Sequence, residues 1–203
     1  MSIADLRRAL ARSRIPIELL GLTYALSLLV GIGMVQMGNG FALHARDRIV
    51  ARAHAADPSA IAYARGSRWR AAMLDASRNL GLGAIPETVG GLGIFLPYPA
   101  AAYRGWVGGI VSVGSTHVSR LTEPRQAAYY VITIILQLIP YSLAGGAGVM
   151  LGLSYYASRR AGKSVERWLT LPADAVRDVA RVYALVVPLF LVASLWEFLS
   201  PWN

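Results

Sequence analysis

Long apolar stretches alternate with shorter, Arg-rich stretches along the chain. A helix needs about 20 consecutive apolar residues to cross the hydrocarbon core of a bilayer. Five stretches approach or exceed that length, and they predict membrane-spanning helices at about 15–43, 74–96, 101–117, 127–157 and 176–202. The pattern therefore predicts an all-α, polytopic transmembrane helical bundle that forms one domain over 1–203, with about five spans and a range of four to six.

Two polar segments, 44–73 and 158–175, separate these apolar stretches. The first is rich in Ala and Arg, which favour helix, and Asp57-Pro58 interrupts it with a pair that can end one helix and start the next. We expect this loop to be partly helical and amphipathic, as two short helices lying on the membrane. An ordinary solvated connector is the alternative.

Helix breakers interrupt the apolar stretches, most densely in NLGLGAIPETVGGLGIFLPYP at 79–99. A proline removes one backbone hydrogen bond of a helix and kinks or ends it. We therefore expect 127–157 to be kinked at its proline or split there into two half-helices, and a split would add a sixth span. The predicted helix breaks are Pro86, Pro97, Pro140 and Pro188.

Composition supports membrane residence. The chain is 55% hydrophobic with a mean hydropathy of +0.46, and its 15% of charged residues lies below the roughly 25% of soluble domains. Its net charge of +9 does not indicate nucleic-acid binding, because the basic clusters flank apolar spans and contain no recognition motif. Membrane lipids are the better partner for these clusters.

Cysteine and histidine offer little chemistry. The absence of Cys excludes disulfides and thiolate sites, and the three scattered His residues predict no metal site. We also expect no cofactor.

The basic cluster Arg7 to Arg14 precedes the first apolar stretch. That stretch is too long for a signal peptide, so we expect a retained helix. We expect the chain to be a multi-pass protein of a bacterial-like cytoplasmic membrane. The positive-inside rule then favours a cytoplasmic N-terminus, although this orientation leaves seven Arg residues of the first loop outside. Four Trp residues are expected as interfacial anchors: Trp69, Trp106, Trp196 and Trp202.

Small residues recur at a spacing of four in two stretches. Such stripes let the backbones of two helices approach closely in a membrane. They predict packing faces, either within this chain or against a second copy or partner subunit. The residues are Ala101, Gly105 and Gly109, and Ala144, Gly148 and Gly152.

Three carboxylates, Glu18, Glu87 and Glu197, lie in or near the predicted spans. Charged groups there are expensive unless they pair, take up a proton or face the bundle interior. Glu87 follows Pro86, so we expect it in the first turn of a half-helix, where it would cap the free N–H groups. Arg78 or Arg104 are candidate partners. A proton or cation relay and lipid-headgroup binding remain alternative roles.

The C-terminal two thirds resemble a known family. IPYSLAGGAGVMLG followed by ALVVPLFLVASLWEFLSP resembles the stage II sporulation protein M family of integral membrane proteins. Pro140, Glu197, Phe198 and Pro201 match the motifs of that family. Tyr141, Ser142 and Gly145 stand where the family has His, Gly and Glu, and Arg104 with Gly105 replaces an Asn-Gly turn.

The resemblance implies a helical membrane component of a multiprotein assembly. Because no catalytic motif is present, we expect a non-enzymatic scaffold or accessory subunit that packs partner helices or lipids on its Gly-rich faces. A small transporter or channel component using Glu87 and Glu197 is the alternative. A membrane hydrolase acting on lipid is a third possibility.

Overall fold

The computed structural model describes residues 2–160 and 170–202, and the regular elements within these residues are helices. They are α1 (Ile3–Arg12), α2 (Arg14–Gln36), α3 (Gly40–Ala56), α4 (Pro58–Ala64), α5 (Arg68–Arg78), η1 (Asn79–Ala84), α6 (Ile85–Gly90), η2 (Gly91–Gly93), α7 (Pro97–Ile110), α8 (Pro124–Arg160) and α9 (Ala173–Leu199). Within the described ranges, α2, α8 and α9 are long and apolar enough to cross a membrane. The all-helical prediction is confirmed.

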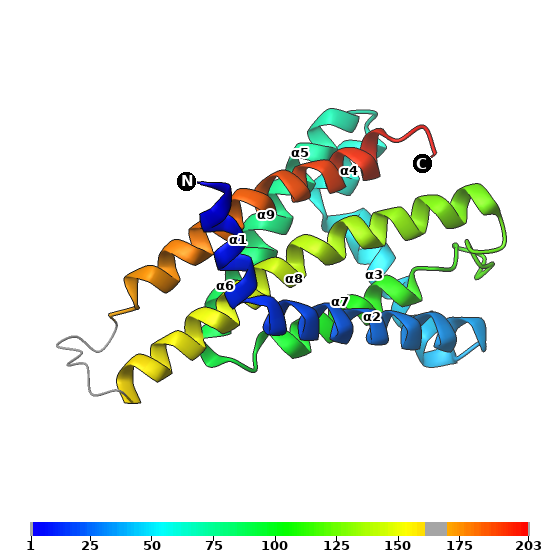
Figure 1. Ribbon diagram of the computed structural model, residues 1–203. Coiled ribbons are helices and arrows are strands. Elements are labelled where there is room, and N and C mark those ends of the chain that lie inside the picture. Colours follow the sequence, from blue (N-terminus) through cyan, green and yellow to red (C-terminus); the bar gives the residue numbers. More distant parts are fainter. Residues whose placement is uncertain (1, 161–169, 203) are drawn as a thin grey trace.

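The bundle has two distinct ends. At the α1 end, α1 meets the start of α2, the last turns of α8 and the start of α9; Arg12 and Asp178 line one small pocket there. At the α3 end, α2 leads into α3, α8 begins and α9 finishes. The Arg125 guanidinium at the start of α8 donates to the Pro201 carbonyl, at 2.6 Å, just after α9. Figure 1 shows α2, α8 and α9 running between these ends.

The polar segment after α2 folds into two helices separated at Asp57, where the sequence predicted a break. The Asn39 carboxamide caps α3 by accepting from the Ala42 amide at 3.1 Å. The Asp57 carboxylate caps α4 by accepting from the Ser59 amide at 2.8 Å, with Pro58 in the first turn. At the N-termini of both α3 and α4, a short polar side chain therefore accepts a hydrogen bond from a backbone N–H group that has no partner within the helix.

One continuous helical run extends from Arg68 to Gly93. The junctions between its parts, at Asn79, Ile85 and Gly91, keep right-handed helical backbone angles. The run begins as α5, widens into the π-helical η1 just before Pro86, and tightens into η2. In a regular α-helix the ring of Pro86 would clash with the backbone carbonyl four residues earlier, and the wider π-helical turn makes room for it. This run corresponds to the stretch predicted at 74–96.

Several predicted boundaries differ from the structure. The first apolar helix ends at Gln36 instead of 43, because Gly38 adopts a φ of +69° and turns the chain into α3. Pro97 begins α7 instead of ending a helix, which suits a residue whose missing N–H is tolerated in a first turn. The predicted helix 101–117 correspondingly ends at Ile110, and a loop follows.

The two long helices near the C-terminus pass through their prolines without a break. Pro140 lies fully buried inside α8, which is one helix of 37 residues, so a split into half-helices does not occur. Pro188 lies inside α9. The predicted loop 158–175 is shorter at both ends, and its residues 161–169 lie outside the described structure.

Both stripes of small residues face helices of the same chain. A Cβ added to Gly105 would overlap the Tyr24 carbonyl of α2, and one added to Gly109 would overlap the Leu28 carbonyl. A Cβ on Gly148 would overlap the backbone of Thr88 in α6. Ala101 and Ala144 are buried on these same faces, and Gly152 continues the second one against η2. These stripes therefore hold α7 to α2 and α8 to the run from α5 to η2.

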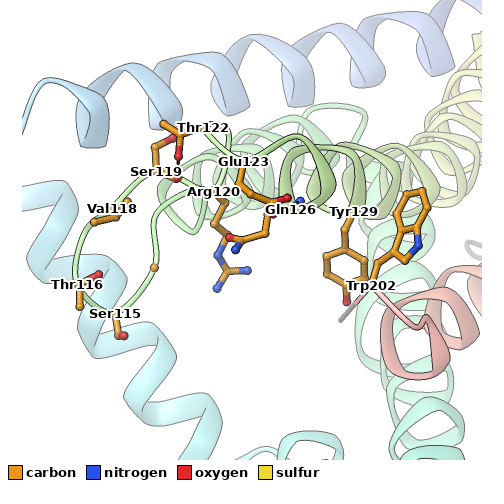
Figure 2. Close-up of a pocket in the computed structure, with 11 residues that line it drawn as sticks. Ser115, Thr116, Val118, Ser119, Arg120, Thr122, Glu123, Gln126, Tyr129 and Trp202 are labelled. Carbon is orange, nitrogen blue, oxygen red and sulfur yellow. Dashed lines mark hydrogen bonds between the residues drawn. The ribbon is translucent and has the colours of Figure 1, made fainter.

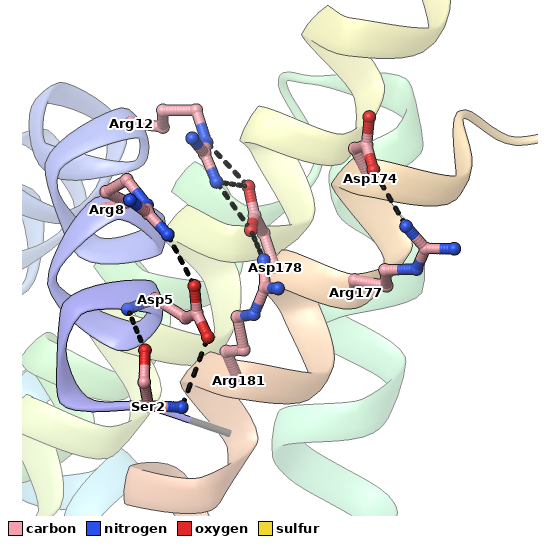
Figure 3. A network of polar contacts seen from close by, with 8 residues as sticks. All are labelled: Ser2, Asp5, Arg8, Arg12, Asp174, Arg177, Asp178 and Arg181. Carbon is pink, nitrogen blue, oxygen red and sulfur yellow. Dashed lines mark hydrogen bonds and ion pairs between the residues drawn. The ribbon is translucent and has the colours of Figure 1, made fainter.

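An N-terminal helix that the apolar pattern did not predict lies across α9. Ser2 and Asp5 form a capping box at its start, and Ala9 is fully buried against α9. The guanidinium of Arg12 donates to both carboxylate oxygens of Asp178, from Nε at 2.6 Å and from Nη2 at 2.7 Å. Figure 3 shows Asp178 between Arg12 and Arg181, so this carboxylate fastens α1 to α9.

Candidate functional site

A buried ion pair joins α6 to α7. The Arg104 Nη1 donates to Glu87 Oε2 at 2.7 Å, with the Glu87 side chain 2% exposed and that of Arg104 26% exposed. The Arg104 guanidinium also lies over the ring of Tyr141 in α8, with its Cζ 3.8 Å from the ring centroid. A cation placed over an aromatic face gains further attraction, most strongly when water is excluded. Three helices therefore share one charged centre.

Glu87 holds this place for a reason different from the predicted one. It does lie in the first turn of α6, after Pro86, but the preceding residues are helical too, so no open helix end is present for it to cap. Its carboxylate is directed to Arg104 instead. Gly145 makes the room: a Cβ there would be 3.1 Å from Glu87 Oε1 and 2.9 Å from Leu20 Cδ1.

A chain of hydrogen bonds leads from Tyr141 towards α9. The Tyr141 hydroxyl donates to Asn79 Oδ1 at 2.7 Å, and Asn79 Nδ2 donates to Asp75 Oδ2 at 2.9 Å. The same Asp75 oxygen accepts from the Ser194 hydroxyl at 2.7 Å. Tyr141 fits against the π-helical turn because position 83 is Gly, where a Cβ would be 2.7 Å from the hydroxyl. The polar groups thus form one connected network through the bundle interior.

Glu197 lies nearer the α3 end than Glu87 and one turn along α9 from Ser194, the residue that donates to Asp75. Its Oε2 accepts from Gln137 Nε2 at 2.7 Å, and its backbone carbonyl accepts from the Tyr129 hydroxyl at 2.7 Å. Glu87 lies beside Gly145, whereas Glu197 is bonded to Gln137. Gly145 and Gln137 are eight residues apart on α8, which corresponds to about 12 Å along the helix axis at about 1.5 Å per residue. Glu87 and Glu197 are held by different partners and do not form a carboxylate pair.

The remaining predicted residues lie outside the network. Glu18 is exposed and accepts from Arg14 at 2.7 Å on the same helix. Arg78 pairs with Asp57 at 3.3 Å and not with Glu87. The four predicted anchor Trp residues differ in exposure: Trp69 is exposed at the start of α5, Trp106 contacts Met34 and Phe41, and Trp196 lies between Tyr129 and Trp202 near the end of α9.

Asp75, Asn79, Tyr141 and Ser194 complete the network and were not among the predicted site residues. Asp75 and Asn79 carried a usable signal, since residues four apart lie on one face of a helix. The apolar pattern placed Asp75 at the edge of a span and gave no reason to direct it inward. Tyr141 and Ser194 gave no signal at all, because a single hydroxyl in an apolar helix is common and acquires a role only from its neighbours.

The network can hold charge and position helices, and its parts are acids, amides, hydroxyls and one guanidinium. Among the described residues no group of three or more His, Asp or Glu side chains could hold a metal ion. Thr88 adds a further polar contact between helices: its hydroxyl donates to the Ala144 carbonyl at 2.9 Å and lies 2.7 Å from the Tyr183 hydroxyl.

Family profiles, curated proteins and solved structures were compared with the chain, and no match was found.

Proposed function

We propose that the protein is a non-enzymatic integral membrane scaffold or accessory subunit of a multiprotein membrane assembly. The observation that carries this proposal is the ion pair between Glu87 and Arg104 inside the bundle. Buried charges that are paired and hydrogen-bonded fix how helices sit relative to one another. The close backbone contacts at Gly105 and Gly148 act in the same direction, towards a tightly packed bundle.

The proposal includes five membrane passes: α2, the run Arg68–Gly93, α7, α8 and α9. At 1.5 Å per residue, the 14 residues of α7 extend about 21 Å, short of the roughly 30 Å of hydrocarbon. A short pass is tolerable for α7 because it packs along α2 and is shielded by protein. An odd number of passes places the termini on opposite sides, with the N-terminus cytoplasmic.

This topology can be tested by labelling, because the native chain contains no Cys. Single Cys residues would replace Ala4 near the N-terminus and Ser115 in the loop after α7, both exposed. A membrane-impermeant maleimide added to intact cells should label the Ser115 variant, and the Ala4 variant only after permeabilisation. Labelling of both variants from outside would exclude the proposed arrangement.

The resemblance to the stage II sporulation protein M family supports a role in an assembly. Gly145 stands where that family has Glu, and Glu87 places a carboxylate beside Gly145 from another helix. A carboxylate is therefore present at this position in both cases, but in this chain it comes from α6 instead of α8. Because the glycine stripes already hold the chain's own helices, we place partner contacts on other surfaces, such as the exposed apolar face of α2 around Leu22, Leu26 and Leu29.

The decisive experiment is purification from native membranes in a mild detergent, followed by identification of co-purifying proteins. The scaffold proposal expects a defined set of partners in stoichiometric amounts. The Glu87→Gln variant should retain fewer of them, whereas the matched Glu18→Gln variant, altered at an exposed position, should retain all. Recovery of the wild-type chain alone as a monomer would contradict the proposal.

A transport or relay function is the second candidate, and one observation favours it. The hydrogen-bond chain Tyr141–Asn79–Asp75 extends the Glu87–Arg104 centre through the interior. Ionisable residues inside a membrane often mark proton or ion pathways. Purified wild-type protein in liposomes that conducts protons or ions, with Glu87→Gln folding normally but abolishing the flux, would favour this function over a scaffold.

A further inference from the structure

A polar pocket lies at the α3 end, outside the interior network. It has a volume of about 710 Å³ and is bounded by the loop 114–123, the first turns of α8 and Trp202 near the C-terminus. Cavities of a few hundred to about 1,000 Å³ are typical of small-molecule sites. Figure 2 shows the Arg120 side chain extending from the loop into the space bounded across from it by Tyr129 and Trp202.

The loop that carries Arg120 is held in place independently of that side chain. The Arg120 amide donates to the Ser112 carbonyl at 2.8 Å, across the bridge between Val113 and Ser119. The Ser119 hydroxyl accepts from Gln36 Nε2 at 2.6 Å, which ties the loop to the end of α2. The wall of the pocket is therefore a built structure, and the Arg120 guanidinium projects from a fixed base.

The guanidinium of Arg120 is unpaired within the described residues. Its guanidinium makes no hydrogen bond or ion pair there, although it is partly buried. Glu123 lines the same pocket, but its carboxylate is engaged by the backbone: Oε1 accepts from the Arg125 amide at 3.1 Å and Oε2 from the Gln126 amide at 2.9 Å. Glu123 thus caps α8 and, within the described part of the chain, forms no ion pair with the Arg120 guanidinium.

Aromatic side chains form the opposite wall of the pocket. Tyr129 stacks on Trp196 with ring centroids 6.0 Å apart, and Trp202 meets Trp196 edge-on at 5.8 Å. The Arg125 bond to the Pro201 carbonyl holds the tail that carries Trp202. Tyr and Trp gather at the level of lipid headgroups, where an apolar ring and a polar edge both find suitable surroundings. Val118, which lines the pocket, and Trp202 are both exposed apolar side chains.

We propose that this pocket binds the phosphate of an anionic phospholipid headgroup, with Arg120 as the main ligand and with Tyr129 and Trp202 as an aromatic wall at the level of the headgroups. A guanidinium matches two phosphate oxygens at once, and such charge-assisted hydrogen bonds are stronger than neutral ones. A guanidinium that forms no ion pair among the described residues favours a headgroup with a net negative charge. This inference rests on the proposed membrane placement and is independent of the scaffold role.

The test uses the full chain in detergent and native mass spectrometry, titrated separately with dioctanoyl phosphatidylglycerol, dioctanoyl phosphatidylcholine and inorganic phosphate. Wild-type protein should bind one phosphatidylglycerol saturably, and the other two at least tenfold more weakly. Arg120→Gln should weaken phosphatidylglycerol binding about tenfold or more, and Arg120→Lys, which keeps the charge, by less. Arg52→Gln, which removes an exposed charge from α3, is the matched control and should bind normally.

Each alternative result has a distinct meaning. Equal weakening by Arg120→Gln and Arg52→Gln would overturn the pocket, because it would indicate diffuse attraction to a basic surface. Phosphatidylcholine binding as tightly as phosphatidylglycerol would overturn the selectivity for an anionic lipid. Inorganic phosphate binding as tightly would overturn the lipid as occupant and leave a phosphate site. Loss of partner proteins from the wild type, with lipid binding intact, would count against the scaffold and leave this site standing.

Discussion

The ion pair between Glu87 and Arg104 leads to a prediction about coupling. In Arg104→Gln, the Glu87 carboxylate, 2% exposed, loses its charged partner. Removing one member of a buried pair costs about 3–5 kcal/mol, and protonation of the carboxylate keeps the cost near the lower figure. In Glu87→Gln, Arg104 is 26% exposed and retains the Tyr141 ring, so we expect about 1–2 kcal/mol.

The double variant leaves two neutral side chains that can hydrogen-bond to each other. We expect its loss of stability to be about 2 kcal/mol smaller than the sum of the two single losses, because neither charge is then left unpaired. The free energy of unfolding would be measured at pH 7 by reversible titration with SDS in mixed micelles. Far-UV circular dichroism would follow the loss of helix.

The exposed pair Arg14–Glu18 supplies a matched control. Its side chains are 74% and 58% exposed and are bonded at the same 2.7 Å. Solvent screens such a pair, so the same double-variant cycle should give a coupling below about 0.5 kcal/mol. If the Glu87–Arg104 cycle gave a coupling no larger than this control, the reasoning that burial makes this pair important would be refuted.

Three further predictions concern packing, the network and pH. Gly148→Ala should lower the free energy of unfolding by about 1–3 kcal/mol in SDS titration, because the added Cβ would overlap the backbone of α6. Gly33→Ala is the control: open space surrounds this glycine, so the substitution should be neutral or stabilising by up to about 1 kcal/mol. Equal effects of the two substitutions would contradict the close contact at Gly148. Tyr141→Phe should cost about 1 kcal/mol in the same assay through its lost hydroxyl, and an unchanged stability would show that the hydrogen bond contributes nothing. The hydrogen bond from Arg46, and then His117, lowers the pKa of Asp47 below its ordinary value of 3.8, so this carboxylate stabilises the fold above that value and the stabilisation is lost as the pH falls through the lowered pKa. Asp47→Asn should therefore reduce the Tm at pH 7 and match the wild type in strong acid, and a Tm difference that persists in acid would count against this origin.

The helical class and most of the long helices could be predicted from residue order, because helix and membrane entry depend on local properties. Runs of apolar residues marked α2, α8 and α9, and Asp57-Pro58 marked the boundary between α3 and α4. Boundaries set by a single backbone angle were harder. The chain has several Gly and Pro residues near these boundaries, and each of them could have ended or started a helix. The packing of the neighbouring helices selected the turn at Gly38 and the start of α7 at Pro97.

The sequence alone also identified Glu87 and Arg104 as charges that needed an explanation, and the two stripes of small residues as contact faces. It could not assign their partners, because an ion pair between α6 and α7 depends on the distance between two helices, and each helix is compatible with many neighbours. Only the tertiary structure joined Asp75, Asn79 and Tyr141 to that pair. Only it placed Arg120 beside Tyr129 and Trp202 without a partner in the part of the chain that it describes. The physical reason is the same in each case: hydropathy is summed along the chain, whereas pairing and its absence depend on residues that folding brings together.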